Sequence, residues 1–283
     1  MIDRRPAGRA VQDGVIIDAQ ALAIAWSDPA AQWGLGVFET VAVRDGGPRL
    51  LEEHARRLAH AANRMRVPLP SPSEIEAAAG VVCRGVAGGY GWLKLVASRS
   101  GRWATFGGAS DPSEEGRAVA VVVLPWKRHR LDPLTAIKSL AYAGSIVGLE
   151  QARRSGADEG LWLNERGHVM EACAANVFVV AGRAAVTPSL ADGARDGVTR
   201  ARAIDVLRAM GLSVRQSKVR FATLRGADEI FLTSSLCGVR PVVRIDGRDV
   251  RGGIAGPVTR ALAEQVAPSA ASGAMARHDG QVG

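Results

Sequence analysis

The feature that most constrains the fold of this chain is a series of short apolar runs in its second half. Residues 160–164 (GLWLN) and 168–172 (HVMEA) flank the turn ERG, and residues 177–188 (VFVVAGRAAVTP) repeat the pattern. Apolar runs of this length, bounded by turn residues, are typical of buried strands. Further runs follow at 229–233 and 239–250. The sequence therefore predicts several short strands here, together with helices at 145–155 and 196–210.

The first half of the chain predicts a smaller unit of mixed strands and helices. Strands are expected at 14–25 and 36–44, and helices at 50–65, ended by Val67-Pro68, and at 74–86. Two more strands, at 92–98 and 118–126, are expected around a glycine-rich loop at 101–117. The fold class is therefore α/β (α+β) with two domains, residues 1–124 and 135–267, joined by a charged, proline-flanked linker at 125–134. Residues 268–283 are expected to be a disordered tail.

The charge of the chain limits its expected partners. The formal net charge is +8, which a solvated arginine-rich surface explains and which attraction to a small anionic ligand also explains. The basic residues are dispersed and aromatic residues make up only 5% of the chain, so nucleic acid is not an expected partner.

Neither a membrane nor an oxidising compartment is expected. No stretch of about 18 uncharged apolar residues is present, and the N-terminus MIDRRPAGRA lacks the apolar core of a secretory signal. Cys83, Cys173 and Cys237 are far apart and form neither a disulfide framework nor a CxxC zinc pair. We therefore expect a cytoplasmic protein without a metal site.

One acidic residue interrupts an apolar segment, and one of the few lysines lies in a similar setting. Glu171 lies within HVMEACAANVFVV, where a carboxylate has to be solvated, paired or neutralised. Lys138, one of four lysines, follows Ile137 just after the linker. Desolvation lowers the pKa of a lysine and yields a nucleophilic amine, although a surface lysine at a strand end fits the same residues.

Two segments could hold an anion. In DGVTR, residues 196–200, a glycine precedes a predicted helix whose free N–H groups suit a phosphate, and Thr199 adds a hydroxyl; an ordinary aspartate cap is the alternative. Thr233, Ser234 and Ser235 follow the strand EIFL and could donate to phosphate oxygens or simply form a turn. The patterns GxGxxG and GxxxxGK[ST] are absent, so a dinucleotide or nucleoside triphosphate site of the usual kind is not indicated.

An amine, a phosphate cradle and a buried carboxylate together suit pyridoxal 5′-phosphate (PLP). Lys138 would bind its aldehyde, and Glu171 would keep the pyridine nitrogen protonated, so that the ring acts as an electron sink. The cation that Glu171 meets would then be the pyridinium.

The order of these segments resembles that of the fold-type IV PLP enzymes, also called class IV aminotransferases, from about Trp33 to Asp246. The resemblance is carried by WGLGVFETVAVRDG, HARRL, IKSLAY, GADEGLWLNERGHVMEACAANVF, DGVTRARAIDVL and DEIFLTSSLCGVRPV. It implies a small N-terminal α/β domain and a larger C-terminal domain with a β-barrel-like core. It also implies a homodimer, with the site between the domains and near the subunit boundary.

The resemblance also assigns roles to residues. Lys138 is expected to bind the cofactor covalently and to move the substrate proton, and Glu171 is expected to pair with the pyridine nitrogen. Other residues resemble the family's cofactor-binding positions: Arg57, Val198, Thr199 and Ser235 at the phosphate, Tyr142 near the ring hydroxyl, and Asn176 beside the cofactor.

Within the family, the sequence leans toward 4-amino-4-deoxychorismate lyase, which releases pyruvate to give 4-aminobenzoate, a folate precursor. GLGVFETVAV, YGWLKLVASRSGRW and MEACAANVF resemble lyase segments, although the glycine run of the second is reduced to SGRW. The alternative is an aminotransferase for branched-chain or D-amino acids. Because a guanidinium suits a carboxylate, Arg99, Arg102 and Arg240 are candidate substrate residues, and Thr40 is a fourth; surface or core roles fit all four as well.

Overall fold

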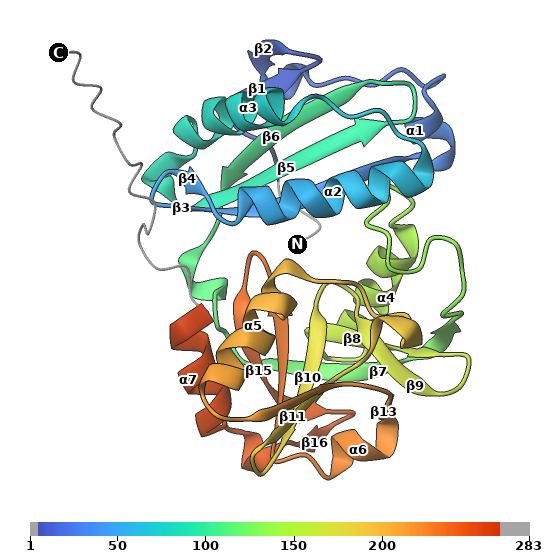
Figure 1. Ribbon diagram of the computed structural model, residues 1–283, viewed down its shortest axis with the longest axis vertical. Helices are drawn as coiled ribbons and strands as arrows, with labels where there is room; N and C mark the ends of the chain where they lie inside the picture. The colour runs from blue at the N-terminus through green and yellow to red at the C-terminus, as the bar shows by residue number, and fades with distance from the viewer. Residues whose placement is uncertain (1–4, 267–283) are drawn as a thin grey trace, which may run out of the picture.

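The computed structural model describes residues 5–266, which form two sheets stacked one above the other (Figure 1). The first sheet is antiparallel in the order β2-β1-β6-β5-β3-β4. Its strands are β1 (Arg9–Gln12), β2 (Val15–Asp18), β3 (Gly36–Arg44), β4 (Gly47–Pro48), β5 (Gly91–Ser98) and β6 (Trp103–Ala109). Short α1 (Pro29–Trp33) precedes β3, and α2 (Leu51–Met65) and α3 (Pro72–Arg84) pack on the sheet.

The helices of this unit form where the sequence predicts them, with local capping setting their ends. The apolar stripe of α2 buries Leu58 and Ala62 against β3 and β5. Helix α3 begins two residues before the predicted start, because Ser71 and Glu74 form a reciprocal capping box and Pro72 occupies the first turn. The strand predicted at 14–25 is wrong beyond Asp18, whose side chain caps a 3₁₀ turn.

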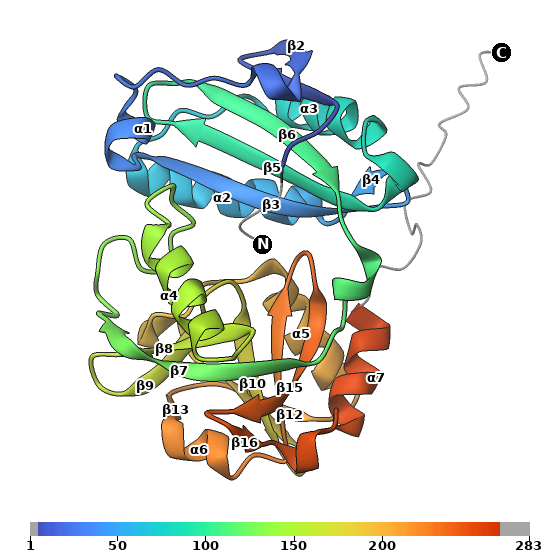
Figure 2. The same ribbon diagram turned by 180° about the vertical axis from the view of Figure 1, so that it is seen from behind.

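The second sheet curls around its own core (Figure 2). Its order is β12-β11-β10-β14-β15-β7-β8-β9-β13, with β16 paired to β15. The strands are β7 (Val119–Arg128), β8 (Glu159–Asn164), β9 (His168–Ala172), β10 (Asn176–Ala181), β11 (Ala184–Thr187), β12 (Ser213–Gln216), β13 (Val219–Arg220), β14 (Glu229–Ser234), β15 (Gly238–Ile245) and β16 (Arg248–Asp249). The hairpins predicted at 160–188 are confirmed as β8–β9 and β10–β11.

Helices flank this sheet, and short 3₁₀ turns connect several elements. The helices are α4 (Ala143–Arg154), α5 (Val198–Ala209), α6 (Phe221–Arg225) and α7 (Pro257–Val266). The 3₁₀ turns are η1 (Ala19–Ala21), η2 (Ala87–Gly89), η3 (Pro112–Glu114), η4 (Leu190–Asp192) and η5 (Arg251–Gly253). The helix predicted at 196–210 is confirmed as α5, and its Ile204 and Leu207 are buried as expected.

Two strand assignments from the sequence need correction. The loop predicted at 101–117 contains β6, which pairs with β1 and β5. The strand predicted at 118–126 within the first unit is β7, which pairs in parallel with β8 and β15 of the second sheet. The division of the chain at residue 124 stays a prediction, but sheet membership changes between β6 and β7.

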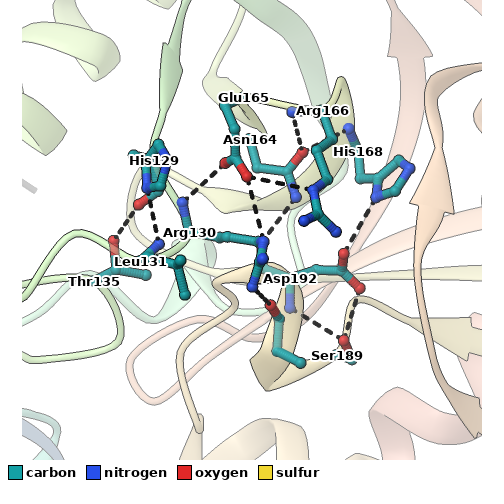
Figure 3. Close-up of polar contacts among 11 residues, drawn as sticks. His129, Arg130, Leu131, Thr135, Asn164, Glu165, Arg166, His168, Ser189 and Asp192 are labelled. Atoms are coloured by element: carbon teal, nitrogen blue, oxygen red, sulfur yellow. Dashed lines mark hydrogen bonds and ion pairs between the residues drawn. The ribbon is translucent and has the colours of Figure 1, made fainter.

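The segment predicted as a linker is partly strand and partly an anchored loop. Residues 125–128 are the end of β7. After them, the N–H of Arg130 donates to Glu165 at 3.0 Å, and the Thr135 hydroxyl donates to the His129 carbonyl at 3.0 Å (Figure 3). This loop leads directly to Lys138, so its anchorage to the β8–β9 turn helps to position that lysine.

No helix within residues 5–266 is both long and apolar enough to cross a membrane. The predicted disordered tail at 268–283 lies outside the described residues.

Candidate active site

A cavity lies between the two sheets, and all eight residues predicted to bind the cofactor line it. They come from six places in the fold: Arg57 from α2, Lys138 and Tyr142 from the segment before α4, Glu171 from β9, Asn176 from β10, Val198 and Thr199 from the start of α5, and Ser235 from the residue after β14. The structure thus brings together residues that are up to 178 positions apart in the chain, from Arg57 to Ser235.

Lys138 is held by main-chain contacts with β3. Its carbonyl accepts from the N–H of Phe38 at 2.9 Å, and Ser139 forms an isolated bridge with Val37. The amine lies 4.4 Å from the centre of the Phe38 ring. Burial is the main cause that lowers the pKa of Lys138 to about 7, and the positive charges of Arg195 and Arg57 contribute to this value against the opposing charges of Glu39 and Glu171. Near neutral pH a large fraction of this amine is therefore unprotonated and nucleophilic.

Glu171 meets two guanidinium groups in the structure. The main-chain N–H of Arg195 donates to Oε2 at 3.1 Å, and its Nη2 donates to Oε1 at 3.4 Å. Arg128 Nη1 lies 3.7 Å from Oε1, and its guanidinium stacks on Trp162. The sequence analysis missed both arginines. Arg195 directly precedes the DGVTR segment, and this adjacency is the signal that could have found it.

The start of α5 forms an anion cradle. Gly197 occupies the N-cap, and no side chain caps the helix, so the N–H groups of Val198 and Thr199 stay available. A Cβ on Gly197 would lie 2.0 Å from Oδ1 of Asn176, so the backbone can approach this closely only with glycine. Asn176 in turn donates to the Arg195 carbonyl at 2.8 Å, which fixes the loop before the helix.

Arg57 is oriented by a carboxylate that the sequence analysis missed. Glu39 accepts from Arg57 Nε and Nη2, both at 2.7 Å, and from His54. Arg57 Nη1 also donates to the Asp196 carbonyl at 3.0 Å, which ties α2 to the cradle. Glu39 interrupts an apolar strand as Glu171 does, so the same reasoning could have identified it.

The predicted substrate residues divide into two groups. Thr40 lines the cavity, and the strand register places it beside Lys94, which is itself opposite Phe106. Arg99, Arg102 and Arg240 are absent from the cavity lining. Arg99 and Arg102 lie at the β5–β6 turn, where Arg102 pairs with Asp13 at 2.7 Å, and Arg240 donates to the Arg117 carbonyl.

Lys94 is a cavity residue that sequence reasoning missed. Its ammonium lies 4.6 Å from the centre of the Phe38 ring, and burial lowers its pKa. Among the described residues no ion pair is formed by this lysine within 4.0 Å. It is therefore the available cation of the cavity wall formed by the first sheet.

The residues of the cavity fit PLP. A lysine of lowered pKa suits its aldehyde, an uncapped helix start and an arginine suit its phosphate, and a buried carboxylate suits its pyridine nitrogen. Thr233 Oγ1 is buried in the cavity wall without a partner among the described residues, which leaves a free hydroxyl beside the cradle. The fold of two stacked sheets and the site between them together define a PLP enzyme.

Comparison with known proteins identifies the family. Residues 36–245 match the family model for amino-transferase class IV, which covers most of the chain, so the protein belongs to the class IV aminotransferases. A putative branched-chain-amino-acid aminotransferase of Methanocaldococcus jannaschii is 29% identical, with 89% of this chain and 93% of that protein covered.

Solved structures agree with this assignment. A branched-chain aminotransferase of Thermoproteus uzoniensis superposes with a TM-score of 0.83 at 25% identity, covering 91% of this chain and 93% of that chain. A hypothetical aminotransferase of Mycobacterium tuberculosis in its PLP-bound form gives 0.82 at 25% identity, covering 92% and 97%. A putative 4-amino-4-deoxychorismate lyase of Legionella pneumophila gives a TM-score of 0.78 at 25% identity, covering 87% of this chain and 94% of that chain.

The expected fold-type IV architecture, with its two curled sheets, and the PLP cofactor are confirmed. The roles of individual residues stay predictions.

Proposed function

We propose that the protein is a PLP-dependent aminotransferase that acts on amino acids with apolar side chains, such as the branched-chain amino acids. The observation that carries the proposal is Lys138, a buried amine with a pKa of about 7 in a cavity that also holds Glu171 and the α5 cradle. Relatives named as branched-chain aminotransferases support the substrate class. The lyase activity favoured by the sequence has less support from these relatives.

The cofactor, when bound, spreads over its ring the negative charge left on the substrate carbon after proton removal. Lys138 is the group that we assign to proton transfer, because its pKa of about 7 lets the amine accept and return a proton near neutral pH. Phe38 and Tyr142 pack edge to face beside it, with ring centres 5.2 Å apart, and restrict the position of the amine. Glu171 would keep a proton on the ring nitrogen of the bound cofactor.

The first-sheet wall of the cavity supports the proposed substrate class. Phe38, Trp92 and Phe106 offer apolar contacts to a substrate side chain. Lys94, without an ion-pair partner, is placed to receive a substrate carboxylate. Lys94→Met is expected to raise KM more than it lowers kcat, because it removes an interaction made in ground and transition state alike.

One structural observation supports a second candidate function, that of a 4-amino-4-deoxychorismate lyase. Its substrate carries two carboxylates, and the cavity offers Lys94 in addition to Arg195; the Legionella structure shares the fold. The deciding experiment supplies the PLP-loaded protein either with leucine, isoleucine, valine or D-alanine plus 2-oxoglutarate, or with 4-amino-4-deoxychorismate. Glutamate formation supports the aminotransferase. Pyruvate and 4-aminobenzoate with no glutamate would overturn it in favour of the lyase.

We further propose that the protein is a homodimer. Ile24, Trp26 and Trp33 are 54%, 87% and 71% exposed. Ile24 lines an apolar groove with Leu22 and Trp103 on the first unit. Exposed apolar area of this kind marks an association surface. Light scattering after size exclusion is expected to give twice the mass of 29.7 kDa, and Trp26→Ser is expected to shift the protein toward monomer.

A further inference from the structure

Three hydrogen-bonded polar groups, Glu39, His54 and Ser235, form a chain next to the part of the cavity that we assign to the cofactor phosphate. Glu39 Oε2 lies 2.8 Å from His54 Nδ1, and His54 Nε2 lies 3.2 Å from Oγ of Ser235. Glu39 and His54 are 0% and 1% exposed, so water does not compete for these contacts. Ser235 lines the cavity. The imidazole therefore connects a fully buried carboxylate to a hydroxyl that faces the cofactor site.

The carboxylate determines which nitrogen of His54 carries hydrogen. Burial raises the pKa of Glu39, but the hydrogen bond from His54 and the charge and hydrogen bonds of Arg57 outweigh burial and bring this pKa to about 2. An ionised carboxylate only accepts hydrogen bonds, so Nδ1 is the donor. In a neutral imidazole Nε2 is then an acceptor, and Ser235 has to donate its hydrogen to it. Ser235 presents only lone pairs to the cavity in that state.

A phosphate dianion gains no hydrogen bond from Ser235 in that state. Its oxygens accept hydrogen bonds, and a hydroxyl whose hydrogen is already donated to His54 offers them none. One additional proton removes the conflict. If the proton binds Nε2, His54 donates to Ser235 and the hydroxyl turns to the phosphate. If it binds the phosphate, the phosphate donates to Ser235. Either arrangement takes up one proton from solution.

We propose that His54 is a positioning residue that couples the binding of the cofactor phosphate to the uptake of a proton. The inference rests on the assignment of Ser235 to the phosphate, which the resemblance to the family supplies. Glu39 from β3 contacts His54, and Arg57, on the same helix as His54, contacts Glu39. Lys138 and Arg195 act on Glu39 from across the cavity. Glu39, whose pKa is about 2, stays ionised between pH 7 and 9, and Arg195, whose pKa is raised, stays charged.

The test uses the full chain carrying Lys138→Ala, which removes the cavity amine whose pKa is about 7. Pyridoxamine 5′-phosphate and pyridoxamine are titrated calorimetrically between pH 7 and 9, where a phosphate monoester is mostly dianionic because its second pKa is about 6. We expect the affinity for the phosphorylated ligand to fall by up to about tenfold per pH unit. The fall should level off after roughly 10- to 100-fold, the worth of one hydrogen bond to a charged group. Pyridoxamine serves as the matched ligand and should lack this component.

Two variants in the same background test whether His54 and Ser235 cause the pH dependence. In His54→Gln a neutral amide can donate to Ser235 without titrating, so the phosphate-specific pH dependence should disappear. Ser235→Ala should abolish it too while leaving the Glu39–His54 pair intact, and it serves as the second arm if His54→Gln folds poorly. Retention of the pH dependence in Ser235→Ala, or its absence in the parent, overturns the proposal. Only binding is measured, so a wrong substrate assignment for the active enzyme would leave these outcomes unchanged.

Discussion

Lys138 allows a quantitative test of the site through protein stability. Burial lowers its pKa from 10.5 to about 7 in the folded protein. Between these values the unfolded chain binds the proton and the folded chain does not, so stability rises with pH across this window. The destabilisation by the buried charge is fully present below about pH 7 and is lost as the pH approaches 10.5.

The expected magnitude follows from the pKa difference. Each tenfold change in proton affinity corresponds to about 1.36 kcal/mol, so the full penalty is roughly 4–5 kcal/mol. Between pH 7 and pH 9.5 about 3 kcal/mol of it should be recovered. Replacement by methionine keeps the length and apolar body of the side chain and removes the charge. Lys138→Met should therefore be more stable than the wild type at pH 7 and nearly equal to it at pH 10.

The assay is urea unfolding of the PLP-free wild type and Lys138→Met across this pH range, and the quantity of interest is the difference between the two proteins. Groups that titrate in both proteins cancel in this difference. Lys127, which is exposed on β7, provides the matched control, and Lys127→Met should show a flat difference. A pH-independent difference for Lys138→Met would refute the reasoning, because it would mean that the amine stays charged in the folded site.

Three other substitutions test separate parts of the structure. Glu171→Gln should lower single-turnover rates by orders of magnitude while PLP still binds with an altered absorbance band; a normal rate per loaded site would contradict its assignment to the pyridine nitrogen. Arg57→Ala should weaken PLP binding by about 1.5–3 kcal/mol, roughly tenfold or more, as measured by titration of the PLP-free protein, and unchanged affinity would remove Arg57 from the phosphate site. Glu229→Ala removes the acceptor of the Val258 and Thr259 N–H groups at the start of α7 and should lower stability by about 1–3 kcal/mol with activity per folded molecule preserved; an unchanged melting temperature would contradict this.

The fold was predictable where periodicity carries the signal. The strand at 36–44 and the helices at 50–65 and 196–210 follow from local apolar patterns and form in the structure. Strand β6 was missed because its Gly107 and Gly108 suggest a loop. A Cβ on Gly107 would lie 2.3 Å from the Trp92 carbonyl, so glycine here permits close strand packing. The sheet that β7 joins was misassigned because alternation predicts a strand and not its neighbour.

The site was predictable where a motif is local and was missed where partners come from distant segments. In DGVTR and in IKSLAY the predicted site residues lie within one short segment, and all of them line the cavity. Glu39, His54 and Ser235 lie on β3, on α2 and after β14, and no spacing rule links them. His54 lies four residues before Leu58 on the buried face of α2, but histidine is a polar residue of only intermediate average burial, so the helix pattern gives no reason to expect it to be 1% exposed. A buried polar residue can be recognised only once its hydrogen-bonding partners in the folded protein are known.

The question of which cation meets Glu171 has more than one answer because a carboxylate has more than one acceptor site. Its two oxygens offer about four lone-pair positions. In the structure the main-chain N–H of Arg195 occupies one of these positions on Oε2, and the side chain of Arg195 occupies one on Oε1. Arg128 is farther away, at 3.7 Å. Capacity therefore remains for a pyridine N–H on the cavity side, and pairing with arginine does not exclude pairing with the cofactor. The arginines also stabilise the buried charge of Glu171 when no cofactor is bound. It follows that Glu171→Gln should lower both the melting temperature and the rate, and that the rate alone reports on the ring nitrogen.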